Sequence, residues 1–157
     1  MKFAFLAILA LSLLAGCATT GGGRADQVQE VHLFGMPAAL NMDGRPGADG
    51  FAVRVYIIKP GSVKGAQIGS GSIEVLMFDG VVGVNDMTSV PPAQTWRFAR
   101  RELAPLEEQT SLGFGYRFTL RWNAKPNQGH ITLVARHVPT KGDVVYSAPS
   151  TIPSATK

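Results

Sequence analysis

The chain has 157 residues, a formal net charge of +4 and a single cysteine. One cysteine cannot form a disulfide within the chain, so a disulfide-stapled scaffold is excluded. A positive charge of this size gives no strong case for nucleic-acid binding. The length suits one domain with its own hydrophobic core.

The first sixteen residues have the pattern of a targeting segment. Lys2 supplies a positive charge, and residues 3–14 are apolar except for Ser12. This run suits the apolar region of a signal peptide and falls short of the roughly 20 residues that a membrane-spanning helix needs. No later stretch is long and apolar enough to span a bilayer, so the remainder is expected to be exported and soluble.

The cysteine follows this segment directly, in the sequence Leu14-Ala15-Gly16-Cys17. This tetrapeptide resembles the lipobox of bacterial lipoproteins. The resemblance implies that signal peptidase II recognises Leu14, Ala15 and Gly16 and cleaves before Cys17. It also implies that Cys17 carries a diacylglyceryl group and an acyl chain such as palmitate, which anchor the protein in a membrane. Ala18 in the next position implies sorting to the outer membrane, at its periplasmic face.

Two other interpretations of Cys17 remain open. An ordinary signal peptide could be cleaved at the small-x-small sequence Gly16-Cys17-Ala18. A buried structural thiol would also account for a lone cysteine, but Cys17 lies outside any segment with the pattern of a folded core. The lipid anchor is therefore the favoured interpretation.

The segment after the cysteine, residues 18–27 (ATTGGGRADQ), is small, polar and glycine-rich, which predicts a flexible tether. The folded domain is expected over residues 28–157, where apolar and polar residues alternate with period two. In chain order, the predicted strands are residues 28–34, 51–58, 72–78, 95–99, 115–122, 130–138 and 144–148.

The strand pattern favours one fold class. Residues 103–112 could hold one short turn of helix, and Pro105 argues against a longer one. Eighteen glycines and ten prolines suit short strands with tight connections. About seven strands with one apolar and one polar face predict an all-β fold, a two-sheet antiparallel β-sandwich that is immunoglobulin-like or transthyretin-like.

A loop rich in oxygen ligands precedes the strongest early strand. The sequence Asn41 to Gly50 (NMDGRPGADG) contains Asn41, Asp43 and Asp49, separated by glycines that permit sharp bends. Calcium takes six to eight oxygen ligands, so a calcium-dependent or glycan-binding module that uses this loop is one hypothesis. The alternative, which the chemistry favours, is a pair of Asp-Gly turns with no metal.

Four arginines share the outward parity of their strands: Arg54, Arg117, Arg121 and Arg136. If these strands are neighbours, the arginines form a basic face suited to a protein partner, an acidic glycan or anionic lipid headgroups. The alternative is a solvated outer face that keeps the sheet soluble.

No catalytic pattern stands out, so an enzyme is not expected. The Gly69 to Ser72 sequence lacks the last glycine of a nucleophile elbow. The three histidines have no metal-ligand spacing. Side chains of the adjacent pair Glu107 and Glu108 diverge on any regular backbone. No cofactor is expected beyond the lipid on Cys17.

The early strand Val53-Arg54-Val55-Tyr56, in a lipidated β-sandwich, resembles the small outer-membrane lipoprotein of type VI secretion systems. That resemblance implies a transthyretin-like fold that docks onto an inner-membrane partner, and it carries over no site residues. The function expected from the sequence is a membrane-anchored lipoprotein. Its β-sandwich would act as a binding or scaffolding module for a protein or another envelope component.

Overall fold

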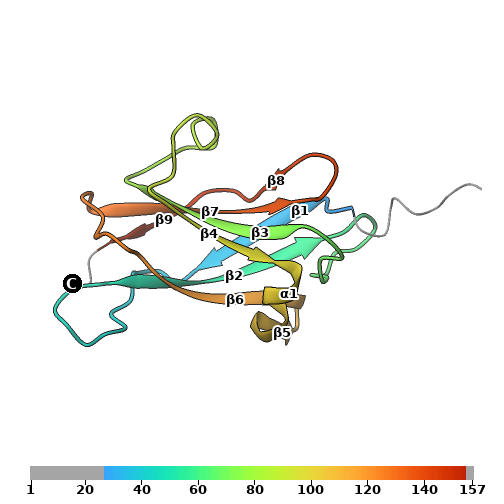
Figure 1. Ribbon diagram of the computed structural model, residues 1–157, viewed down its shortest axis with the longest axis horizontal. Coiled ribbons are helices and arrows are strands. Elements are labelled where there is room, and N and C mark those ends of the chain that lie inside the picture. Colours follow the sequence, from blue (N-terminus) through green and yellow to red (C-terminus); the bar gives the residue numbers. More distant parts are fainter. Residues whose placement is uncertain (1–26, 155–157) are drawn as a thin grey trace, which may run out of the picture.

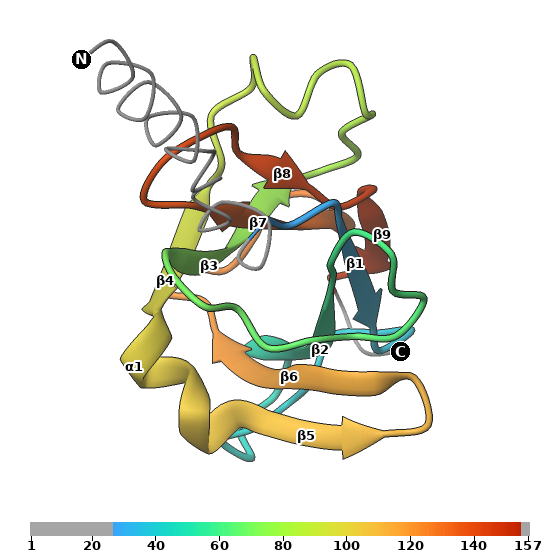
Figure 2. The ribbon, with the colours of Figure 1, turned by 90° about the vertical axis from the view of Figure 1, so that its right-hand side faces the viewer.

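The alternating segments of the sequence form β-strands in the computed structural model, which describes residues 27–154. Within these residues, nine strands form two antiparallel sheets that pack face to face (Figures 1 and 2). The predicted all-β, two-sheet sandwich is confirmed. The signal segment, Cys17 and nearly all of the tether lie outside the described residues, so their interpretation stays a prediction.

Sheet A has the strand order β1-β2-β6-β5. Its strands are β1 (Glu30–Gly35), β2 (Gly50–Ile58), β5 (Glu107–Thr110) and β6 (Gly113–Arg121). The two long central strands pair from Gly50 opposite Arg121 to Tyr56 opposite Gly115. This register turns the apolar residues of both strands toward sheet B, because successive side chains alternate between the two faces.

Sheet B contains β4 (Gln94–Ala99), β3 (Ser72–Asp79) and β7 (His130–Val138), in that order. The other side of β7 pairs with two short strands, β8 (Val145–Tyr146) and β9 (Ser150–Pro153). Between them, Ser147 continues the pairing, since its N–H donates to the Ala135 carbonyl and its hydroxyl accepts from the Ala135 N–H. This edge of the sheet is therefore made of two pieces.

The connection from β4 to β5 differs in detail from the prediction. The 3-10 turn η1 (Ala104–Leu106) lies within the predicted range, but it is preceded by a helix that begins before that range, α1 (Arg100–Leu103). Glu102 stabilises its start by accepting a hydrogen bond from the Ala99 N–H. The next residues form β5, a strand that the sequence did not predict. None of the helices among residues 27–154 is long and apolar enough to cross a membrane.

The main core lies between the sheets. Its largest fully buried members include Phe51, Ile57, Ile73, Met77, Tyr116, Phe118, Ile131 and Leu133. Burial raises the pKa of the Tyr116 hydroxyl, an effect that the hydrogen bond from the Ile68 N–H partly offsets. That hydrogen bond, at 3.0 Å, holds the loop between β2 and β3 against the core.

A second, smaller core covers the outer face of sheet B. Leu76 and Phe78 of β3 and Val134 of β7 point away from sheet A, yet all are buried. The loop 80–93 covers them with Val82, whose N–H donates to the Thr132 hydroxyl (3.0 Å). Figure 2 shows this loop on the side of sheet B away from sheet A. The outer face of sheet B is thus largely closed by the protein's own chain.

We expect Tyr116→Phe to lower the free energy of unfolding by about 1–3 kcal/mol, because the buried Ile68 N–H loses its acceptor. Chemical denaturation measures this change. The control is Ser89→Ala, which removes an exposed hydroxyl that donates to Asp86 and should change stability by less than about 0.5 kcal/mol. Equal stability of the two variants would contradict the role given to Tyr116.

Candidate functional site

The outer face of sheet A carries aromatic and charged side chains in adjacent rows. The strand registers place Phe34 of β1 opposite Arg54 of β2, and Arg54 opposite Arg117 of β6. The neighbouring row runs from His32 through Tyr56 to Gly115 and Glu108. Because residues of one parity share a face, the paired strands bring these side chains together from distant parts of the chain.

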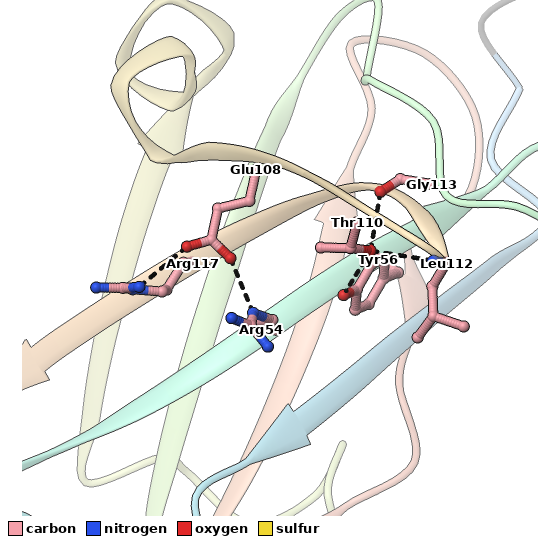
Figure 3. Close-up of polar contacts among 7 residues, drawn as sticks. All are labelled: Arg54, Tyr56, Glu108, Thr110, Leu112, Gly113 and Arg117. Carbon is pink, nitrogen blue, oxygen red and sulfur yellow. Dashed lines mark hydrogen bonds and ion pairs between the residues drawn. The ribbon is translucent and has the colours of Figure 1, made fainter.

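One carboxylate holds two of the arginines. Glu108 of β5 accepts from Arg54 Nε at 2.9 Å and from Arg117 at 3.1 Å (Figure 3). All three side chains are partly exposed, and such pairs contribute about 1 kcal/mol or less each. Two guanidinium groups share one negative charge, so the cluster retains one positive charge that a ligand can neutralise.

The ring of Tyr56 provides an apolar surface beside this cluster. Its ring lies across Gly115, where a side-chain Cβ would come within 2.8 Å of the ring. Its hydroxyl lies 3.2 Å from the Thr110 hydroxyl (Figure 3). Thr110 in turn donates to the Gly113 carbonyl, so Tyr56 is the donor in the first bond. The absence of a side chain at Gly115 lets an outward tyrosine be almost fully buried.

Two exposed apolar side chains lie next to the Tyr56 ring. Phe34 is 54% exposed and makes an edge contact with the Tyr56 ring, with the ring centres 5.7 Å apart. Met36 is 49% exposed. A hollow of about 430 Å³ is lined by both residues, by Leu40, and by Arg54 and Arg117. It combines an apolar wall with two guanidinium groups, which suits a ligand with an apolar group and a carboxylate.

Arg121 belongs to the same face but has a separate partner. It pairs with Asp49 at 3.0 Å, at the end of sheet A where the loop before β2 lies. The structure thus brings Arg54, Arg117 and Arg121 to one face, as the sequence predicts. Each arginine is paired with a carboxylate, so the face is less basic than the arginines alone suggest.

The grouping of Arg136 with these arginines is wrong. Arg136 lies on β7 of sheet B, so it faces away from them. It binds Glu74 at 2.6 Å, and the Tyr146 hydroxyl accepts from it at 2.9 Å. Burial alone would lower its pKa, but Glu74 and Tyr146 outweigh this and raise it. Arg97 also binds the buried Glu74, so Arg136 belongs to a structural ion-pair cluster.

The oxygens of the Asn41 to Gly50 loop receive hydrogen bonds from the loop itself. The Asn41 side chain accepts from the Gly44 N–H, Asp43 from the Arg45 N–H and Asp49 from the Met42 N–H. Gly44 and Gly47 have φ angles of 74° and 110°, which favour glycine. This pattern matches the turn interpretation. Across residues 27–154, no three acidic, histidine or cysteine side chains gather as a metal site would require.

Asp79, at the end of β3, also caps a turn. Its carboxylate accepts from the N–H groups of Asn127 and Gln128, both at 2.9 Å. Burial acts to raise the pKa of Asp79, but these hydrogen bonds and one from the Asn127 side chain outweigh it and lower the pKa. The adjacent glutamates diverge as predicted: Glu107 binds Gln67 and Arg100, and Glu108 faces the opposite way.

Sequence reasoning missed Phe34, Met36 and Glu108 as parts of this face. The alternation of residues 51–58 puts Tyr56 on the same side as Arg54, but sequence reasoning gave Tyr56 no role. Phe34 and Tyr56 have outward parity, but parity alone does not show that an outward aromatic ring belongs to a site. The glycines at 113 and 115 are the available signal, because a glycine inside a strand indicates close approach of another group. Glu108 could not be found because β5 itself was not predicted.

No protein-family model, no curated protein and no solved structure matches this chain. The interpretation of the site therefore depends on its geometry and on the sequence.

We expect Gly115→Ala to lower the free energy of unfolding by about 1–3 kcal/mol, because its methyl group would overlap the Tyr56 ring. The matched control is Gly129→Ala, where no heavy atom lies within 4 Å of the new methyl group. The control should change stability by less than about 0.5 kcal/mol. Urea denaturation of both variants checks this, and equal midpoints would show that the ring does not lie across Gly115.

Proposed function

We propose that this protein is a lipid-anchored binding module of the cell envelope, and that its β-sandwich receives a protein partner on the outer face of sheet A. The supporting observation is the contrast between the two outer faces. The protein's own loop closes much of the face of sheet B, whereas the face of sheet A leaves Phe34 and Met36 exposed beside Arg54 and Arg117. Exposed apolar side chains rimmed by charged ones are typical of interaction surfaces.

The hollow between Phe34 and Arg117 suggests how a partner binds. An apolar side chain of the partner would cover Phe34 and Met36 and remove them from water. A carboxylate of the partner would approach Arg117, which shares Glu108 with Arg54 and is thus only half neutralised. The outer position of these guanidinium groups lets them rearrange with little cost to the fold.

The anchor has a mechanistic role in this proposal. Lipid chains on Cys17 would confine the domain to the outer membrane, at its periplasmic face. Confinement raises the effective concentration of the binding face for partners on the same surface or opposite it. No chemical transformation is proposed, since the face offers recognition groups and no nucleophile with an adjacent base.

The anchor is tested by the mass of the mature protein. We expect the polypeptide to begin at Cys17, to carry the added mass of its acyl chains and to incorporate labelled palmitate. The Cys17→Ala variant should carry no palmitate label, and it should no longer sediment with the membrane fraction. A mature protein with the mass of its amino acids alone would overturn the anchor.

The face is tested by crosslinking in living cells. A photoreactive amino acid in place of Phe34 should capture a discrete partner, whereas one in place of Val81, which is 75% exposed on loop 80–93, should not. Arg117→Glu should reduce the Phe34 crosslink at least tenfold. Arg45→Glu makes the same change of charge on an exposed loop and should leave the crosslink unchanged. Equal crosslinking from positions 34 and 81 would reject the face.

A further inference from the structure

Two exposed aliphatic side chains lie together at one end of the sandwich. Val63 is 95% exposed in the loop after β2, and Leu112 is 54% exposed in the turn between β5 and β6. Both line one hollow of about 330 Å³, which reaches Phe34 and Tyr56 of the sheet A face and is also lined by Glu30, His32, Ile58 and Ser62. The Gly65 N–H donates to the Leu112 carbonyl at 2.8 Å, which ties the loop to the turn.

A hydroxyl group closes each of the two turns that carry these side chains. Ser62 donates to the Lys64 carbonyl and accepts from the Lys64 N–H, which closes the loop around Val63. Thr110 accepts from the Leu112 N–H and donates to the Gly113 carbonyl, which closes the turn around Leu112 (Figure 3). The two turns therefore expose the Val63 and Leu112 side chains to solvent, and nothing within residues 27–154 covers them. This exposure of apolar side chains calls for a functional explanation.

The chain joins the fold at this same end. The Gln29 N–H donates to the Ile58 carbonyl, and Gln27 lies beside Ser70 and the turn 139–143. We call the region of Gln27, loop 59–65, turn 110–113 and turn 139–143 the N-terminal end of the sandwich. Loop 80–93 follows the opposite end of β3 (Figure 1).

The length of the preceding chain limits how the domain can face a membrane. Gln27 comes ten positions after Cys17, and this length of chain spans at most about 36 Å when fully extended. A nine-residue strand such as β2 is itself about 30 Å long. To present the opposite end to the membrane, the tether would have to run along the whole domain. The N-terminal end is therefore the one that can reach the bilayer without a fully extended tether.

From this geometry we propose that the N-terminal end contacts the lipid surface, with Val63 and Leu112 entering the headgroup region. This inference rests on the proposed anchor at Cys17. Lys64 adjoins Val63, and the turn 139–143 contributes Lys141, both exposed. These ammonium groups can pair with anionic headgroups. The acidic groups at this end are Asp143, in the same turn as Lys141, and Glu30, which lies 2.9 Å from His32 Nε2.

The contact orients the domain as well as holding it. The outer face of sheet A extends from the N-terminal end toward the loop before β2. With Val63 and Leu112 in the headgroups, this face stands roughly perpendicular to the membrane and stays open to a partner. Phe34 borders the hollows on both sides of it. The lipid contact itself uses Val63 and Leu112, whereas the charged part of the partner face uses Arg54 and Arg117.

The test uses the full chain, processed in cells and reconstituted into vesicles of phosphatidylethanolamine and phosphatidylglycerol. Because acylation consumes Cys17, a cysteine introduced by Val63→Cys or Leu112→Cys is the only free thiol and takes an environment-sensitive fluorophore. The control is Val81→Cys in loop 80–93. We expect blue-shifted emission and quenching by spin-labelled lipid at positions 63 and 112, and neither at position 81.

Three results overturn the inference in distinguishable ways. If the protein floats with the vesicles but positions 63 and 81 both report water, the anchor holds and the lipid contact is wrong. The lipid contact is equally wrong if position 63 is shielded without lipid quenching, because a second copy or another protein then covers it. If the processed wild-type protein does not float and Cys17 itself takes the fluorophore, the anchor is wrong and this inference fails with it.

Discussion

The pairing of β2 with β6 is the contact on which both the core and the candidate site depend. In the observed register, Phe51, Val53 and Val55 meet sheet B, while Arg54 lies opposite Arg117 on the outer side. A slip by one residue would turn the core residues to solvent and the arginines inward. Gly115 makes this register compatible with an outward Tyr56, because no side chain competes for the space of the ring. One hydrogen-bonded ladder therefore sets the hydrophobic interior and the surface chemistry together.

The two outer faces of the sandwich differ in how they meet solvent. On sheet B, loop 80–93 buries Leu76 and Phe78, and Glu74 is enclosed between Arg97 and Arg136. On sheet A, Phe34 and the Arg54–Glu108–Arg117 cluster remain accessible. Ion pairs on the first face are structural, because loss of a partner would leave a buried charge. Those on the second face are weak enough to be exchanged for contacts with another molecule.

The fold class was predictable because the long strands alternate cleanly, as in residues 51–58 and 115–122. Two of the short strands, β5 and β9, were not. β5 has the sequence Glu-Glu-Gln-Thr, without an apolar residue to set a period, and β9 includes Pro153. Parity predicted that Arg54, Arg117, Arg121 and Arg136 point outward, but parity does not say to which sheet a strand belongs. That is why three of them share a face and Arg136 does not.

The edge of sheet B that is made of β8 and β9 affects whether neighbouring copies of the protein can pair with each other. A continuous outermost strand offers a row of free N–H and C=O groups to which another chain can add. Here that row is broken: β8 has two residues and β9 four, Pro149 lies between them, and β9 ends at Pro153, so two positions lack an N–H group. Copies anchored as proposed at Cys17 would be concentrated in the plane of a bilayer. An interrupted margin of this kind would protect them from strand-to-strand polymerisation along that side.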